Sequence, residues 1–351
     1  MAGARRRRKP VRRQRARPIN LALQGGGAHG AFTWGVLDRL LEDSRIEIDG
    51  ISGTSAGSVN GLMVAYGMAL GGRDEARHLL AELWRRIGQA ARFSPFQPCW
   101  IDRMMGGGNL DFSPGFQAFD LMSRVVSPYQ FNPLDLNPLR DLVSELVDFD
   151  RLRASDTVKL FVSTTDVRSG KIRVFGPKEL RPEVFMASAC LPLLFKAVEI
   201  DGEFYWDGGY MGNPALFPLI YNCRASDIML VEINPIRIEQ VPTDSRAILD
   251  RMNDISFNAT MMREMRAIAF VTRMLDHHRL NGGSGLRRIN FHMVQAEKAM
   301  GRYGASSKFN TDPGFLDTLF RLGRETAADW LDEHFGMIGR DSSVDLHHLF
   351  F

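Results

Sequence analysis

Cysteine is scarce in this sequence. Among 351 residues there are three, Cys99, Cys190 and Cys223, and they lie far apart. An odd number at such wide spacing fits neither a disulfide framework nor a cluster of metal-binding thiolates. We therefore expect a protein of a reducing compartment, the cytoplasm, without a structural metal.

Long hydrophobic runs are also missing. No window approaches the roughly 20 apolar residues of a membrane-spanning helix. The apolar run at 19–23 passes directly into glycines, so it is shorter than the roughly 7 to 15 residues of a secretory signal core. With 44% hydrophobic and 24% charged residues, the chain has the composition of a soluble globular protein and carries no sign of export.

Acidic residues are absent from the first 18 positions, which hold nine of the 44 lysines and arginines. The remaining chain carries 35 bases against 41 acids, a formal charge of −6. We expect residues 1–18 to form a disordered arm able to contact anionic membrane, where each basic residue contributes about 1 kcal/mol near the surface. No nucleic-acid recognition module follows the arm, so we do not expect nucleic-acid binding.

A glycine-rich loop follows the first apolar segment. Residues 19–23 predict a strand, and apolar residues at helical spacing resume shortly after the loop. Gly25, Gly27 and Gly30 spell GxGxxG, a pattern of dinucleotide-binding turns, but the acidic residue that would hold a ribose is missing after the next strand. The alternative is that the amides of Gly26 and Gly27 stabilise a developing oxyanion.

A second motif follows the next apolar segment. Gly53, Ser55 and Gly57 form GxSxG, in which small flanking residues let two backbones pass closely and leave the serine exposed at a helix N-terminus. The Ala56 amide would be a further oxyanion donor. Because adjacent parallel strands end at the same edge of a sheet, the loop and the serine should lie side by side. The alternative is an ordinary helix start rich in small residues.

The middle of the chain contains two further features. Periodicity is lost over 93–115, where aromatic residues and methionines alternate with prolines and glycines. These aromatics either fill the core or line a lid or acyl-chain channel. A hairpin predicted over 198–206 ends in Asp207, Gly208 and Gly209; by itself Asp207 would be an ordinary turn carboxylate.

The sequence changes character after residue 234. Long helices are expected over 245–280 and 313–335, with a linker rich in glycine and serine between them. The methionines of the first helix suit core packing.

Three motifs thus stand in order: the glycine loop at 25–30, GxSxG at 53–57 and Asp-Gly-Gly at 207–209. Together with the proline-containing segment 187–195 and Asn213-Pro214, they make residues 19–234 resemble the patatin-like phospholipase family. The resemblance implies a three-layer α/β/α fold with a mainly parallel central sheet. Residues 235–351 lie outside it as a mainly helical extension.

The resemblance also implies a function. Family members are lipid acyl hydrolases, of the phospholipase A or lysophospholipase type, that use no catalytic histidine, metal or other cofactor. Carried onto this sequence, Ser55 is the nucleophile and Asp207 the base, and the substrate is a lipid or another acyl ester. The implied oxyanion hole consists of Gly25, Gly26, Gly27, Gly30 and Ala56.

His29 departs from the family pattern, which usually has Arg or Lys at this position. We expect His29 to support the glycine loop and to introduce a charge that titrates near neutrality.

Two other functions remain compatible with these motifs. One is an α/β-hydrolase triad completed by His277, His278 or His292, although that fold places its elbow after several strands. The other is a lipid-binding protein, recruited to membranes, whose elbow is vestigial.

Overall fold

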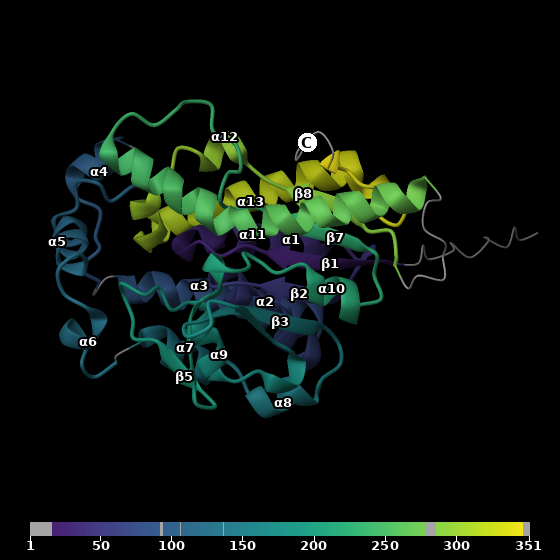
Figure 1. Ribbon diagram of the computed structural model, residues 1–351, viewed down its shortest axis with the longest axis horizontal. Coiled ribbons are helices and arrows are strands. Elements are labelled where there is room, and N and C mark those ends of the chain that lie inside the picture. The colour runs from purple at the N-terminus through teal and green to yellow at the C-terminus, as the bar shows by residue number, and fades with distance from the viewer. Residues whose placement is uncertain (1–15, 92–93, 106, 136, 278–285, 347–351) are drawn as a thin grey trace, which may run out of the picture.

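The computed structural model describes residues 16–91, 94–105, 107–135, 137–277 and 286–346 (Figure 1). Most of the predicted basic arm, residues 1–15, therefore lies outside the described residues. Arg17 and Pro18 do not belong to an arm, because they begin strand β1. The Arg17 guanidinium donates to the carbonyl oxygens of Phe335 and Ile338 at 2.9 and 2.8 Å, which ties this end of the strand to the C-terminal segment.

A mixed sheet forms the centre of the molecule, with strand order β5-β6-β3-β2-β1-β7-β8 and with β4 paired to β3. Strands β3, β2, β1, β7 and β8 are parallel, whereas β4 and β6 run antiparallel to β3. The predicted α/β fold with a mainly parallel sheet is confirmed. The strands are β1 Arg17–Leu23, β2 Ile46–Gly53, β3 Lys159–Asp166, β4 Ile172–Phe175, β5 Val198–Ile200, β6 Glu203–Asp207, β7 Asp227–Val231 and β8 Asn290–Val294.

Helices cover both faces of the sheet. Leu21 and Leu23 face a large core shared with α1, α2, α3 and α13, whereas Ala22 and Leu230 face a smaller core shared with α10 and α11. Alternate residues of these buried strands thus serve opposite layers. The helices are α1 Gly30–Glu42, α2 Ala56–Leu70, α3 Arg73–Ala90, α4 Trp100–Met105, α5 Pro114–Ser123, α6 Pro128–Phe131, α7 Pro138–Leu146, α8 Phe149–Ala154, α9 Pro182–Ser188, α10 Phe217–Asn222, α11 Ser245–Asp276, α12 Glu297–Met300 and α13 Pro313–His334.

The C-terminal segment is built into the same sheet. It contains the two expected long helices, α11 and α13, and also an edge strand, β8, that sequence reasoning did not predict. Helix α13 lies directly on α1, and glycine at positions 35 and 323 allows this close approach. A Cβ at Gly35 or Gly323 would collide with a carbonyl oxygen of the other helix. Within the described ranges, none of the helices has the length and apolar character needed to cross a bilayer.

Candidate active site

Ser55 lies in the sharp turn between β2 and α2, with φ at 51°. A serine rarely adopts this left-handed region, so the surrounding structure must stabilise it. The Ser55 amide donates to Ser188 Oγ at 2.9 Å, and Ser188 Oγ donates to the Ser163 carbonyl at 2.8 Å. At the other side of the turn, Ser58 Oγ donates to the Ser55 carbonyl at 2.7 Å. The serine is therefore held by contacts from β3, α9 and its own helix.

The two glycines of the elbow are needed for close packing. A Cβ at Gly57 would collide with the carbonyl oxygen of Leu23, at the end of β1. A Cβ at Gly53 would lie 2.7 Å from the carbonyl oxygen of Gly57. Any larger residue would force the elbow away from the neighbouring strand.

The glycine loop lies beside this elbow. Strands β1 and β2 are parallel neighbours, and Leu23 pairs with Gly53 where both strands end. A Cβ at Gly25 would lie 2.8 Å from Ser55 Cβ. The structure thus brings the loop and the serine together, as their sequence context predicts.

The loop amides differ in availability. The Gly25 amide donates to Asn213 Oδ1 at 2.7 Å, and the Gly30 amide bonds the Gly27 carbonyl. Gly25 and Gly30 therefore belong to the loop by shaping it, because their amides are already engaged. The amides of Gly26, Gly27 and Ala56 have no hydrogen-bond acceptor within the part of the chain that the structure describes. These three remain free to bind an anion.

Buried amide side chains hold the loop in place. Gln24 Oε1 accepts from the backbone amides of Ile233 and Asn234, at 2.8 and 3.0 Å. Gln24 Nε2 donates to Asn258 Oδ1 at 3.0 Å, and Asn234 Nδ2 donates to the Gly25 carbonyl at 2.9 Å. Sequence reasoning missed this network. Its signal in the sequence was Gln24, a polar amide residue placed directly after the apolar strand β1.

Asp207 ends strand β6 and faces Ser55. Its side chain is only 1% exposed, and its Oδ1 accepts from the Gly209 amide at 2.7 Å. The Ser55 side chain also acts on this carboxyl, because it tends to lower the pKa of Asp207. Burial raises the pKa of this carboxyl to about 7, and the contacts with Gly209 and Ser55 only partly offset the effect. At neutral pH Asp207 is therefore able both to take and to return a proton.

His29 supports the loop as a neutral side chain. Ser307 Oγ donates its proton to the Gly304 carbonyl at 2.7 Å. Ser307 Oγ is also 2.7 Å from His29 Nε2, and it can only accept there, so Nε2 carries the proton. Burial and the nearby Lys308 lower the pKa of His29 to about 3. The expectation that His29 titrates near neutrality is thus wrong, because sequence alone did not reveal its burial.

The buried setting of His29 leads to a prediction for His29→Arg. The added charge would lie near Lys308 without an acidic partner, and we expect a loss of about 3 kcal/mol or more of folding free energy. Chemical denaturation compares this variant with His29→Gln, which keeps a neutral donor and should lose less. Equal stability of the arginine variant and the parent would contradict the neutral role of His29.

The histidines proposed for a triad lie elsewhere. His292 Nε2 is 3.0 Å from Asp227 Oδ1 and its Nδ1 is 3.1 Å from Ser343 Oγ, so both ring nitrogens are engaged near the beginning of β7. His277 follows the end of α11, and His278 lies outside the described residues. The structure gives no support to a triad through His277 or His292.

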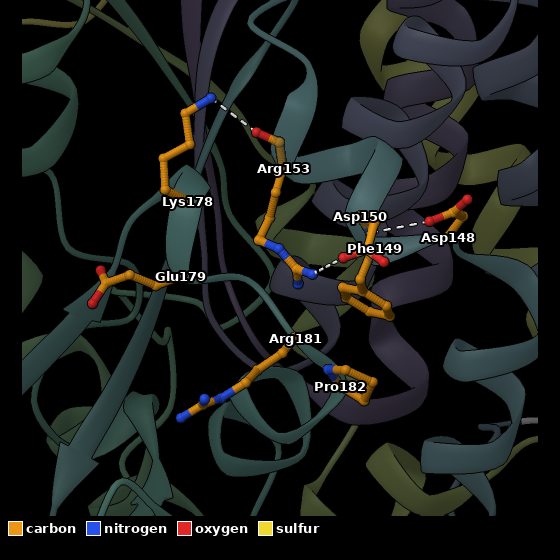
Figure 2. Close-up of a pocket in the computed structure, with 8 residues that line it drawn as sticks. All are labelled: Asp148, Phe149, Asp150, Arg153, Lys178, Glu179, Arg181 and Pro182. Carbon is orange, nitrogen blue, oxygen red and sulfur yellow. Dashed lines mark hydrogen bonds and ion pairs between the residues drawn. The ribbon is translucent and has the colours of Figure 1, made fainter.

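A polar cavity of about 480 Å³ lies between α8 and the beginning of α9. Figure 2 shows the eight side chains that line it. Its charged groups have partners: Lys178 Nζ donates to the Arg153 carbonyl at 2.8 Å, and Arg153 pairs with Asp150. Glu179 and Arg181 pair with Arg173 and Asp201, which do not line the cavity. None of the motif residues lines it. Within the described ranges, His, Cys, Asp and Glu do not gather in threes that would hold a metal ion.

An α/β sheet with a strained serine beside a glycine loop and a buried carboxylate has the arrangement of a serine acyl hydrolase. The chain belongs to the patatin-like phospholipase family, whose model matches residues 21–220. Membership in this family implies a lipid acyl hydrolase. A comparison with curated proteins found no match.

Solved structures with detectable similarity are distant. VipD from Legionella pneumophila is 16% identical, with 91% of this chain and 67% of that chain covered and a TM-score of 0.43. The type III effector protein ExoU is 15% identical, with 91% and 54% covered and a TM-score of 0.36. ExoU in its heterodimeric complex with SpcU, from Pseudomonas aeruginosa, is 16% identical, with 96% and 72% covered and a TM-score of 0.31. The chain thus spans about half the length of the first ExoU structure.

Proposed function

We propose that the protein hydrolyses carboxylic ester bonds of lipids, as a phospholipase A or lysophospholipase-like esterase, through a dyad of Ser55 and Asp207. The observation that carries the proposal is the strained turn of Ser55, which lies beside the glycine loop while its side chain acts on the buried Asp207 carboxyl. Family membership supplies the substrate class, and this arrangement supports the choice of the reacting residues.

In the first half of the reaction, Ser55 Oγ attacks the ester carbonyl carbon while Asp207 accepts the hydroxyl proton. Negative charge then develops on the carbonyl oxygen. The free amides of Gly26, Gly27 and Ala56 would stabilise it, helped by the N-terminus of α2. As the tetrahedral intermediate collapses, Asp207 returns its proton to the leaving alcohol and an acyl-enzyme remains.

In the second half, water replaces the alcohol. Asp207 accepts a proton from the water, whose oxygen attacks the acyl carbonyl carbon. Collapse of this intermediate releases the fatty acid, and the proton returns to Ser55 Oγ.

Labelling with a fluorophosphonate tests the proposal. We expect one covalent adduct per chain on Ser55, located by intact-mass and peptide-mass measurements, because an activated serine reacts with this probe. Ser55→Ala should lose the label, whereas Ser144→Ala, a change at an exposed serine of α7, should keep it. A folded parent without an adduct, or with an adduct elsewhere, would reject Ser55 as the nucleophile.

We also propose a cytoplasmic protein that contacts anionic membrane through its N-terminal residues. Deleting residues 2–15, which contain eight of the nine basic residues of the arm, should weaken binding to anionic vesicles, most strongly at low salt. The deletion stops before Arg17 so that β1 stays intact. Equal sedimentation of parent and truncated protein with such vesicles at low salt would exclude this contact.

A further inference from the structure

The α4–α6 segment, residues 94–134, projects at one end of the molecule (Figure 1). Large apolar side chains on this segment point into solvent instead of into the core. The side chains that are 60 to 78% exposed are Trp100, Met104, Leu121, Val125, Tyr129 and Leu134. Clusters of exposed apolar residues of this kind usually mark a surface that is covered in function.

The inner side of the segment is packed. Phe96 and Phe119 lie 5.1 Å apart between ring centroids, and Phe309 lies 5.7 Å from Phe116 and 5.9 Å from Phe96. These aromatic residues fill the space beneath the segment. Within 93–115 this applies to Phe96, whereas Trp100 and Phe112 are exposed and do not fill the core. The outer apolar side chains are not needed for that packing, so their exposure calls for a separate explanation.

The segment is poor in charge. Residues 94–134 contain two arginines, three aspartates, and no lysine or glutamate, which is half the charged fraction of the whole chain. Asp102 is buried and accepts from the amides of Cys99 and Phe112, while Arg124 pairs with Asp120 at 3.0 Å. A partner recognised by charge is therefore disfavoured, and an apolar partner is favoured.

The segment reaches both sides of the Ser55 site. On one side the Leu110 amide donates to Ser306 Oγ at 3.1 Å, in the short turn Ala305–Phe309 whose Lys308 carbonyl abuts Gly27. On the other side Lys196 Nζ donates to the Pro133 carbonyl at 2.8 Å. Lys196 lies six residues after Cys190, and the Cys190 carbonyl accepts from the Asp207 amide at 2.8 Å. The segment that carries the exposed apolar side chains is thus linked, through one intermediate element on each side, to the glycine loop and to Asp207.

We propose that the outer face of the α4–α6 segment docks on a lipid surface and inserts its exposed side chains among the acyl chains. Trp100 and Tyr129 suit such a boundary, because each has an apolar ring and a polar atom that can stay near the head groups. Docking would bring the Ser55 site close to the lipid. This part of the proposal rests on the proposed function, because only a lipid hydrolase needs its site at the lipid surface. Attachment itself does not depend on hydrolysis or on the basic arm.

Flotation with pure phosphatidylcholine vesicles at physiological salt tests the docking. The full-length Ser55→Ala protein is used so that no lipid is consumed, and these uncharged vesicles give the basic arm no attraction. In that background, Trp100→Ser with Leu121→Ser, at side chains 70 and 68% exposed, should weaken vesicle binding by about tenfold or more. The matched control is Tyr221→Ser with Phe270→Ser, at side chains 78 and 61% exposed on α10 and near the end of α11, and it should bind like the parent.

A second measurement reports on the depth of Trp100 and does not rely on a loss of binding. Lipids brominated in their acyl chains should quench the fluorescence of Trp100, seen as the difference between the parent and Trp100→Ser. Absence of vesicle binding by the parent, absence of this quenching, or equal loss in both double variants would overturn the docking. So would a stable dimer buried through this face. If vesicles bind as expected but Ser55 is neither labelled nor required for hydrolysis, only the proposed function fails.

Discussion

Replacing Asp207 by asparagine should reduce kcat/KM on a soluble ester by about 10³-fold or more, close to the loss expected for Ser55→Ala. Asparagine keeps the shape of the side chain and an acceptor for the Gly209 amide, but it cannot take the Ser55 proton. In a dyad nothing else takes over this transfer. Stopped assays on one water-soluble ester, with circular dichroism to check folding, give both values.

Histidine variants are the controls that separate a dyad from a triad. His277→Ala and His334→Ala should retain nearly all activity, because neither side chain contacts Ser55 or Asp207 in the described structure. His278→Ala and His292→Ala should likewise retain activity. Folding of the His292 variant must be checked, because His292 pairs with buried Asp227. A folded histidine variant as inactive as Ser55→Ala would replace the dyad with a triad.

The second large effect is on pH dependence. Because the base must be ionised and burial raises the pKa of Asp207 to about 7, kcat/KM should rise about tenfold per pH unit below neutrality and level off above it. His29, with its pKa lowered to about 3, adds no second step in this range. Rates measured between pH 5 and 9 on an uncharged ester test this; a flat profile down to about pH 5 would contradict the raised pKa.

The same carboxyl affects stability. Its pKa is raised from 3.8 to about 7, so the folded state holds a proton that the unfolded state has already lost. Its contribution to folding therefore falls as pH rises from about 4 to 7, by at most roughly 4 kcal/mol. Asp207→Asn does not titrate, so its melting temperature relative to the parent should increase over this interval. A constant difference between the two proteins would rule out the linkage.

The local parts of the site can be predicted from the sequence. Gly53, Ser55 and Gly57 form the expected elbow after the second strand, and Asp207 ends the expected hairpin. In each case neighbouring residues determine the turn, and the parallel pairing of β1 with β2 follows from short strands joined by a helix.

Distant contacts could not be predicted. Ser188 reaches the Ser55 amide across more than a hundred residues, and Asn213 takes the Gly25 amide from the glycine loop. The neutrality of His29 depends on Ser307 and Lys308, which lie far along the chain. Strand β8 was missed because Asn290 and His292 interrupt the apolar residues of this five-residue segment. The segment is a strand because it pairs with β7, and that distant contact cannot be seen in the sequence.

The contact between the glycine loop and the C-terminal segment determines how short the chain can be made before the loop loses its support. Gly27 lies against the Lys308 carbonyl, and His29 is enclosed by Ser307, Tyr303 and Phe315. A chain ended after Asn234 would keep Ser55 and Asp207 but expose His29 and leave the backbone of Gly27 without support. The smallest stable unit should therefore extend well beyond residues 21–220, because a chain trimmed to that stretch would lose the residues that pack against Gly27 and His29.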